Sequence, residues 1–194
     1  MSEDVIFTPL RFRNLEVKNR IFRSSISGRF DNEDGSLTQT RINWECKFAK
    51  GGAGAIISSY VPVLMEGRII AGYATVHRDE YIPLWQKLGE AVHSFDCKFI
   101  MQLSHSGRQM DIPGVHNYTR PALSSTSRKE SLHGFLCQAM SLQQIDRTIR
   151  AFARGRIAGP CTAAPSGCMA LCTRSNECAT CAPRRKLRRL TRMP

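Results

Sequence analysis

The stretch Phe99-Ile100-Met101-Gln102-Leu103-Ser104-His105-Ser106-Gly107-Arg108 begins as a short apolar run and turns polar within a few residues. A continuous apolar run of this length is typical of a parallel strand that is covered on both faces. The polar residues after it would then lie at the carboxyl end of the strand, where α/β sheets and barrels bind their ligands. The stretch therefore predicts a buried parallel strand that opens into a functional loop.

Strands and helices alternate along the chain on both sides of this stretch. The expected order is strand Ile21–Gly28, helix Thr38–Ala49, strand Ala53–Tyr60, helix Ile82–Phe95, strand Cys97–Leu103 and helix Met140–Ala153. Each loop that follows a strand is longer than the loop before it, which is typical of a (β/α) barrel. No strand is followed by the Gly-x-Gly-x-x-Gly motif of a dinucleotide-binding sheet. A short hairpin within residues 5–20 would close the bottom of the domain.

The third helix carries both a start signal and an apolar face. Ser141 followed by Gln144 forms a capping box, in which each side chain bonds the main chain of the other residue. Ile145, Ile149 and Phe152 recur at helical spacing, and we expect them to form the buried face of this helix.

Composition divides the chain near residue 153. The 194 residues carry a net charge of +12, and residues 154–194 contribute +8 of it through nine Lys/Arg and one Asp/Glu. The same segment holds five of the eight cysteines. No apolar run approaches the ~18 residues of a membrane span, and the acidic N-terminus does not resemble a secretory signal. We therefore expect a cytoplasmic protein that does not enter a membrane.

Several motifs of the first part resemble the N-terminal half of the old yellow enzyme family, the FMN-dependent NADH:flavin oxidoreductases. In order along the chain they are Phe7-Thr8-Pro9-Leu10 with Val17-Lys18-Asn19-Arg20-Ile21, then Gly52-Ala53-Gly54-Ala55-Ile56-Ile57, Gln102 to Arg108, and Pro121-Ala122-Leu123-Ser124. The family fold is a (β/α)8 TIM barrel with FMN at the carboxyl ends of the strands. The resemblance implies that residues 1–153 are the first three β/α units of such a barrel.

The resemblance also implies which residues contact the flavin. Ser24, Ser25, Ile26 and Ser27 match the loop after the first barrel strand, whose main chain meets the flavin ring. Ser27 takes the place of a small hydroxyl or thiol residue beside a flavin carbonyl. Many family members carry Pro-Met where this chain has Ser25-Ile26.

Two further cofactor-binding residues follow from the second and third strands. Gln102 matches the glutamine that binds the pyrimidine edge of the flavin, which suits an amide because the group both donates and accepts hydrogen bonds. Tyr60 matches a position that is small in most members, so that the local flavin contact would differ.

The activity that the resemblance implies is hydride transfer from NAD(P)H to FMN and then to an electron-poor small-molecule acceptor. The family binds its acceptor with a His pair, or a His and an Asn, from the fourth strand. No such pair follows residue 153, and we name no catalytic residue. We therefore expect a truncated barrel with weak or absent FMN binding and no turnover.

Residues 154–194 depart from the family pattern and are expected to be an irregular, disordered tail. One interpretation is that the reading frame is lost near residues 153–156, which the coding DNA around codon 153 would test. The alternative is a metal- or nucleic-acid-binding module. Four cysteines would bind the metal as thiolates, and a basic run would bind the phosphate backbone: Cys168, Cys172, Cys178, Cys181 and Arg184–Arg189. Short motifs of this kind often match by chance, so we expect no metal site and no nucleic-acid partner.

Overall fold

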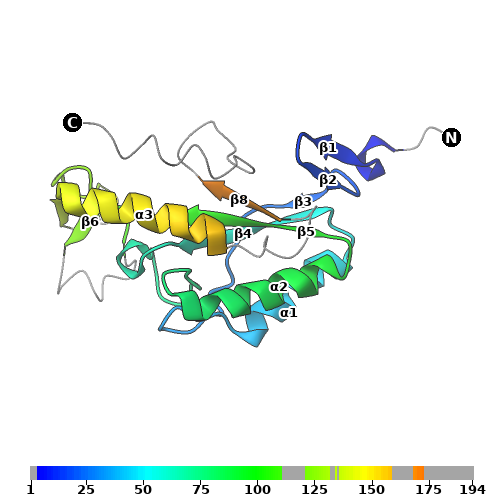
Figure 1. The fold of residues 1–194 in the computed structure, drawn as a ribbon, viewed down its shortest axis with the longest axis horizontal. Helices are drawn as coiled ribbons and strands as arrows, with labels where there is room; N and C mark the ends of the chain where they lie inside the picture. The colour runs from blue at the N-terminus through cyan, green and yellow to red at the C-terminus, as the bar shows by residue number, and fades with distance from the viewer. Residues whose placement is uncertain (1–3, 111–120, 132–133, 135, 159–167, 173–194) are drawn as a thin grey trace.

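The structure, a computed structural model, describes residues 4–110, 121–131, 134, 136–158 and 168–172. Its centre is a four-stranded parallel sheet in the order β3 (Phe22–Arg23), β4 (Ala55–Pro62), β5 (Lys98–Ser104) and β8 (Cys168–Cys172). The helices α1 (Gln39–Lys50), α2 (Ile82–His93) and α3 (Leu142–Ala158) follow β3, β4 and β5 in turn. Strands that neighbour each other in chain order, each followed by a helix, are the predicted β/α units (Figure 1).

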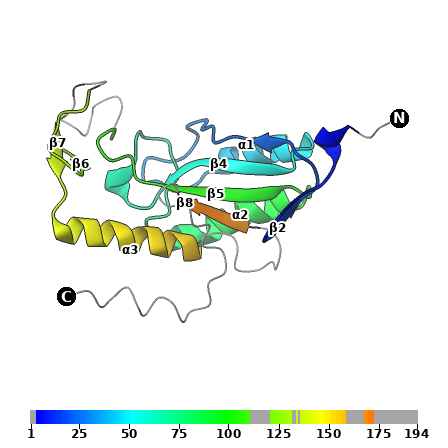
Figure 2. The same ribbon diagram turned by 90° about the horizontal axis from the view of Figure 1, so that it is seen from above.

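Smaller elements lie at the two ends of the sheet. Strands β1 (Leu10–Phe12) and β2 (Leu15–Val17) form the predicted hairpin. At the other end, where α3 begins, β6 (Ala122–Ser124) pairs with β7 (Cys137–Ala139) (Figure 2). Three short 3-10 helices complete the described elements: η1 (Val5–Phe7), η2 (Met65–Gly67) and η3 (Asp79–Tyr81).

Side-chain caps define the starts of α1 and α3. The Thr38 hydroxyl accepts a hydrogen bond from the Arg41 N–H at 3.2 Å. The capping box predicted for α3 is present: Gln144 N–H donates to Ser141 Oγ at 3.2 Å, and Ser141 N–H donates to Gln144 Oε1 at 2.8 Å. These bonds satisfy main-chain groups that a helix end leaves free.

An asparagine and a glycine allow β3 and β4 to start side by side. Asn19 donates from Nδ2 to the Gly52 carbonyl at 2.8 Å and accepts from the Ile21 N–H at 3.1 Å. A Cβ on Gly54 would lie 2.6 Å from the main-chain oxygen of Asn19. The two family-like motifs around residues 19 and 54 therefore meet in one close contact.

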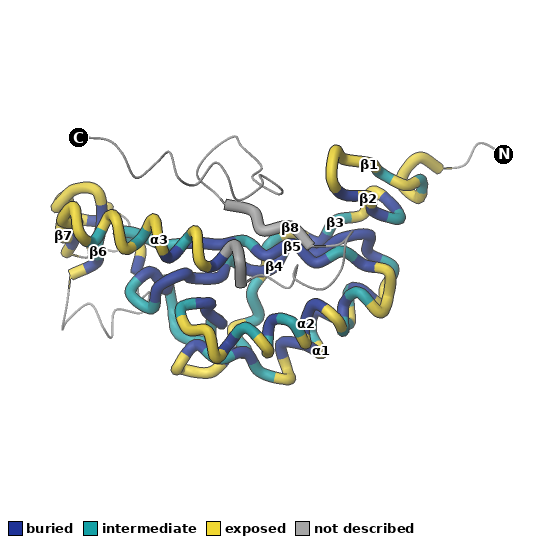
Figure 3. Tube along the Cα trace, in the orientation of Figure 1, coloured by how far each residue is buried: buried dark blue, intermediate teal, exposed yellow. Residues whose placement is uncertain are grey.

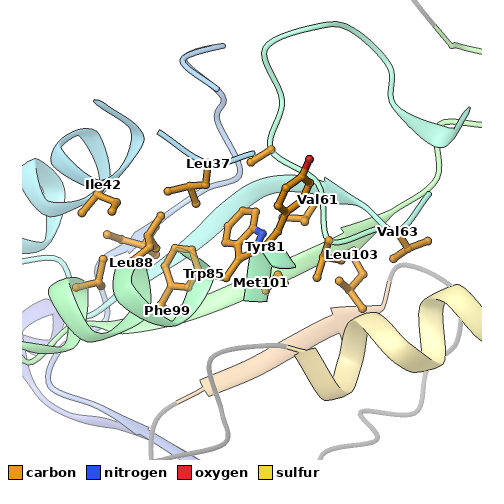
Figure 4. Close-up of a cluster of buried hydrophobic side chains, with 14 of the residues drawn as sticks. Leu37, Ile42, Val61, Val63, Tyr81, Trp85, Leu88, Phe99, Met101 and Leu103 are labelled. Carbon is orange, nitrogen blue, oxygen red and sulfur yellow. The ribbon is translucent and has the colours of Figure 1, made fainter. Parts of the chain in front are cut away.

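The sheet has two different faces. Phe99, Met101 and Leu103 on β5 pack with Trp85 and Leu88 of α2 in the main core (Figure 4). The other face holds a smaller cluster beneath the hairpin, which is formed by Leu15, Val17, Ala55 and Ile100. Because side chains alternate along a strand, Gln102 shares this second, inner face with Ile100.

The predicted buried face of α3 is wrong for Ile145 and Ile149 and confirmed only for Phe152, which is partly buried against the main core. Ile145 is 40% exposed and Ile149 is 63% exposed, and Figure 3 shows most of the helix as exposed. The helix packs through its last turns, where Ala151 joins the main core, Phe152 packs against that core, and a Cβ at Gly155 would lie 3.2 Å from Val63. Helical spacing correctly indicated an apolar face. It could not show that no described element covers Ile145 and Ile149.

The segment after residue 153 differs from expectation in two places. Helix α3 continues to Ala158, across the expected domain boundary. Residues Cys168–Cys172 form β8, which pairs in parallel with β5, rather than irregular structure. Cys168-Met169-Ala170-Leu171-Cys172 is a short apolar run that suits such a strand, although basic and cysteine-rich sequence surrounds it. The rest of the tail lies outside the described residues, and the division at residue 153 stays a prediction.

Candidate functional site

Gln102 and Tyr60 are neighbours at the carboxyl end of the sheet. They are register partners in the parallel pairing of β4 with β5, just beyond an irregularity between Ile57 and Tyr60. The Gln102 N–H donates to the Ser58 hydroxyl at 3.1 Å, which holds β5 at this irregularity. The fold thus brings together two of the residues that were predicted to bind a cofactor.

Three buried polar atoms on and after β5 have no hydrogen-bond partner among the described residues. They are Gln102 Oε1, Ser104 Oγ and Ser106 Oγ. Buried polar atoms are nearly always satisfied in folded proteins, so three of them within five residues mark a place where water or a ligand can supply the missing partners. The serines were not predicted as site residues, although the polar end of the opening stretch contained them.

An aromatic pair forms one side of this region. The rings of Tyr60 and Tyr73 are stacked, with centroids 5.2 Å apart and planes inclined by 29°. Burial and then the neighbouring Tyr73 raise the pKa of Tyr60, so its phenol stays protonated at neutral pH. The pair presents an uncharged aromatic surface beside Gln102.

The predicted loop Ser24, Ser25, Ile26 and Ser27 follows β3 at the same end of the sheet. Ser24 is exposed, Ser25 and Ser27 are half-buried, and Ile26 is 54% exposed. The Ser27 hydroxyl accepts a hydrogen bond from the Arg29 N–H at 3.1 Å, which leaves its own proton available to a ligand.

Beneath this loop lies a buried ionic cluster that the sequence analysis missed. Glu45 on α1 lies between two arginines, with its Oε2 2.7 Å from Arg23 NH1 and its Oε1 2.9 Å from Arg41 Nε. Arg41 in turn contacts Asp31 at 3.4 Å and donates to the Ser59 hydroxyl at 2.6 Å. The i,i+4 spacing of Arg41 and Glu45 was the signal available in the sequence, but such pairs usually lie on a solvated face.

The cluster is formally neutral, because two guanidiniums face two carboxylates. Burial raises the pKa of Glu45, and the adjacent Arg41 and Arg23 guanidiniums oppose that rise. Burial also raises the pKa of Asp31, and Arg41 opposes that rise. The Asp31 carboxylate accepts a hydrogen bond from the Ala74 N–H at 2.9 Å. The cluster joins β3, α1, β4 and two loops into one unit.

Other predicted features have no described counterpart. Within the described part of the chain, no group of three or more His, Cys, Asp or Glu side chains could hold a metal ion. Most of the tail that would carry the metal or nucleic-acid site, including Cys178 and Cys181, lies outside that part. Among the helices that are described, none is long and apolar enough to cross a membrane.

Known proteins resemble this chain over most of its length. Over 148 residues it is 32% identical to an NADH oxidase of Thermoanaerobacter brockii, which covers 76% of this chain and 22% of the relative. Over 154 residues it is 30% identical to an NADPH dehydrogenase of Bacillus cytotoxicus, covering 78% of this chain and 42% of the relative. The chain thus spans less than half of these relatives' length.

Solved structures and a family model agree with these relatives. The crystal structure of Old Yellow Enzyme from Pichia sp. AKU4542 matches with a TM-score of 0.75 at 20% identity, over 87% of this chain and 45% of that one. This likeness shows the fold, which is part of a TIM barrel. The model of the NADH:flavin oxidoreductase / NADH oxidase family matches residues 5–159. The chain therefore belongs to the NADH:flavin oxidoreductase / NADH oxidase family.

Proposed function

We propose that the described residues form one side of an FMN site in an oxidoreductase that uses NAD(P)H and an electron-poor small-molecule acceptor. The observation that carries this proposal is the buried, unpartnered Oε1 of Gln102 beside Tyr60. An amide at this place offers an acceptor and two donors, which fits the alternating donors and acceptors of a flavin pyrimidine ring. When bound, FMN supplies the hydride-transfer chemistry.

The other predicted residues take supporting roles in this proposal. The main chain of Ser24, Ser25 and Ile26 would face the ring, and the Ser27 hydroxyl would donate its free proton to a flavin carbonyl. Tyr60 would limit the space beside the ring, because its side chain is fixed by stacking on Tyr73. These groups orient the cofactor and influence its electronic state.

Isolated chain is expected to hold FMN weakly. The described site residues would contact only one edge of the flavin, and the described part contains no assigned phosphate-binding loop or acceptor-binding pair. Weak binding would correspond to a Kd of about 0.1–1 mM. We expect no NAD(P)H consumption by the 194-residue chain alone.

The test is a titration of the full 194-residue chain with FMN, followed by flavin fluorescence. We expect a weak, saturable change that Gln102→Met removes. Gln109→Met is the matched control, because Gln109 is an exposed glutamine beyond the strand and should leave the titration unchanged. An unsaturable response of the native chain, or equal binding by Gln102→Met, would contradict the proposal.

A further inference from the structure

Arg23, the last residue of β3, reaches both the buried cluster and the exposed loop. Its side chain is 7% exposed, and its NH1 lies 2.7 Å from Glu45 Oε2. Its NH2 donates to the Ile26 carbonyl at 3.1 Å. The guanidinium carbon also lies 4.1 Å from the centre of the Phe48 ring. One planar group therefore has a carboxylate, an aromatic face and a loop carbonyl as partners.

The helix side of this arrangement is rigid. Glu45 and Phe48 both belong to α1, and Glu45 is fully buried and also paired with Arg41. Arg41 extends the connection to Ser59 on β4. The guanidinium of Arg23 is therefore held by groups that belong to the sheet and the helix rather than to the loop.

The loop side has little support of its own. Residues 24–30 contain no helix or strand, and Ile26 is 54% exposed, so apolar burial fixes it weakly. The Arg29 N–H to Ser27 Oγ bond is local to the loop. The bond from Arg23 to the Ile26 carbonyl is thus the described contact that ties the middle of the loop to the buried cluster.

We propose that Arg23 is a positioning residue that fixes the flavin-facing loop Ser24–Ser27 through the Ile26 carbonyl. This inference rests on the proposed function, because the loop matters only if it contacts FMN. The two outer branches of a guanidinium can bind a carboxylate and a carbonyl at once in fixed geometry, whereas a lysine ammonium is a point charge on a flexible stem. The charge of Arg23 balances Glu45 in the cluster, and the second branch of its guanidinium holds the Ile26 carbonyl of the loop.

Backbone ¹⁵N relaxation of the full chain tests this proposal in Arg23→Lys, which keeps a positive charge opposite Glu45. We expect the order parameters of residues 24–28 to fall from about 0.85 to below about 0.6, while those of α1 stay near 0.85. The control is Arg29→Lys, an exposed arginine in the same loop, which should leave both regions unchanged.

Unchanged order parameters in the loop would overturn the proposal, and so would an equal loss in the loop, α1 and β4, which marks a purely structural residue. If Arg23→Lys does not fold, the double variant Arg23→Met/Glu45→Gln keeps the cluster neutral and is measured in the same way. Failure of both variants to fold would also overturn it. The FMN titration is a separate readout: a native chain that ignores FMN refutes the cofactor site but leaves the relaxation result valid.

Discussion

Replacing Gln102 by methionine should stabilise the ligand-free chain while it removes FMN binding. Gln102 Oε1 is buried and has no hydrogen-bond partner among the described residues. An unsatisfied buried polar atom costs about 1–3 kcal/mol, and an apolar side chain of similar shape removes that cost. For a chain of this size, each kcal/mol corresponds to a rise in Tm of about 2–4 °C.

Urea unfolding of the native and variant chains without FMN measures this effect. The midpoint should rise at an unchanged slope, since the slope reports the surface exposed on unfolding. Gln109→Met should leave the midpoint unchanged, because its side chain is exposed. Asn19→Leu should lower it, because that amide makes two described hydrogen bonds.

A lower midpoint for Gln102→Met would refute the reasoning, since it would mean that the amide is satisfied in the folded chain. A higher midpoint with undiminished FMN binding would separate the stability argument from the cofactor argument. The expected combination, greater stability with lost binding, is the signature of a residue kept for function at the expense of stability.

Three further predictions concern other parts of the chain. Gly54→Ala should lower the free energy of unfolding by about 1–3 kcal/mol because its Cβ would crowd the Asn19 carbonyl, and an unchanged urea midpoint would contradict this close approach. Burial and nearby arginines lower the pKa of His77, so the unfolded chain binds more protons and stability falls as pH drops below about 6.5. His77→Gln should make Tm depend less on pH in this range, and an equal dependence of Tm on pH in both chains would argue against it. Ile149→Lys should leave Tm unchanged, since Ile149 is 63% exposed, and a lower Tm would show that the side chain is covered.

Local patterns predicted the elements whose signals are local. The capping box at Ser141 and Gln144 forms as the sequence indicated, because both partners lie within one helical turn. The apolar run of β5 is a buried strand, as its uninterrupted apolar composition indicated. Its polar end was predicted to carry a functional site, which stays a prediction, and the register of β4 with β5 places Tyr60 next to Gln102.

Patterns that depend on distant partners were less informative. Spacing identified an apolar face on α3, yet Ile145 and Ile149 are exposed because the helix packs only near its end, through Ala151, Phe152 and Gly155. Strand β8 was missed because its five apolar residues acquire a strand partner only beside β5.

The sequence by itself determined the succession of β/α units and the capping box that starts α3. These features depend on neighbours a few residues away in the chain. Only the tertiary structure decided that Arg23, Asp31, Arg41 and Glu45 share one buried cluster, and that Arg23 also binds the Ile26 carbonyl. Charged residues normally lie in water, so their burial becomes favourable only when the fold brings opposite charges together.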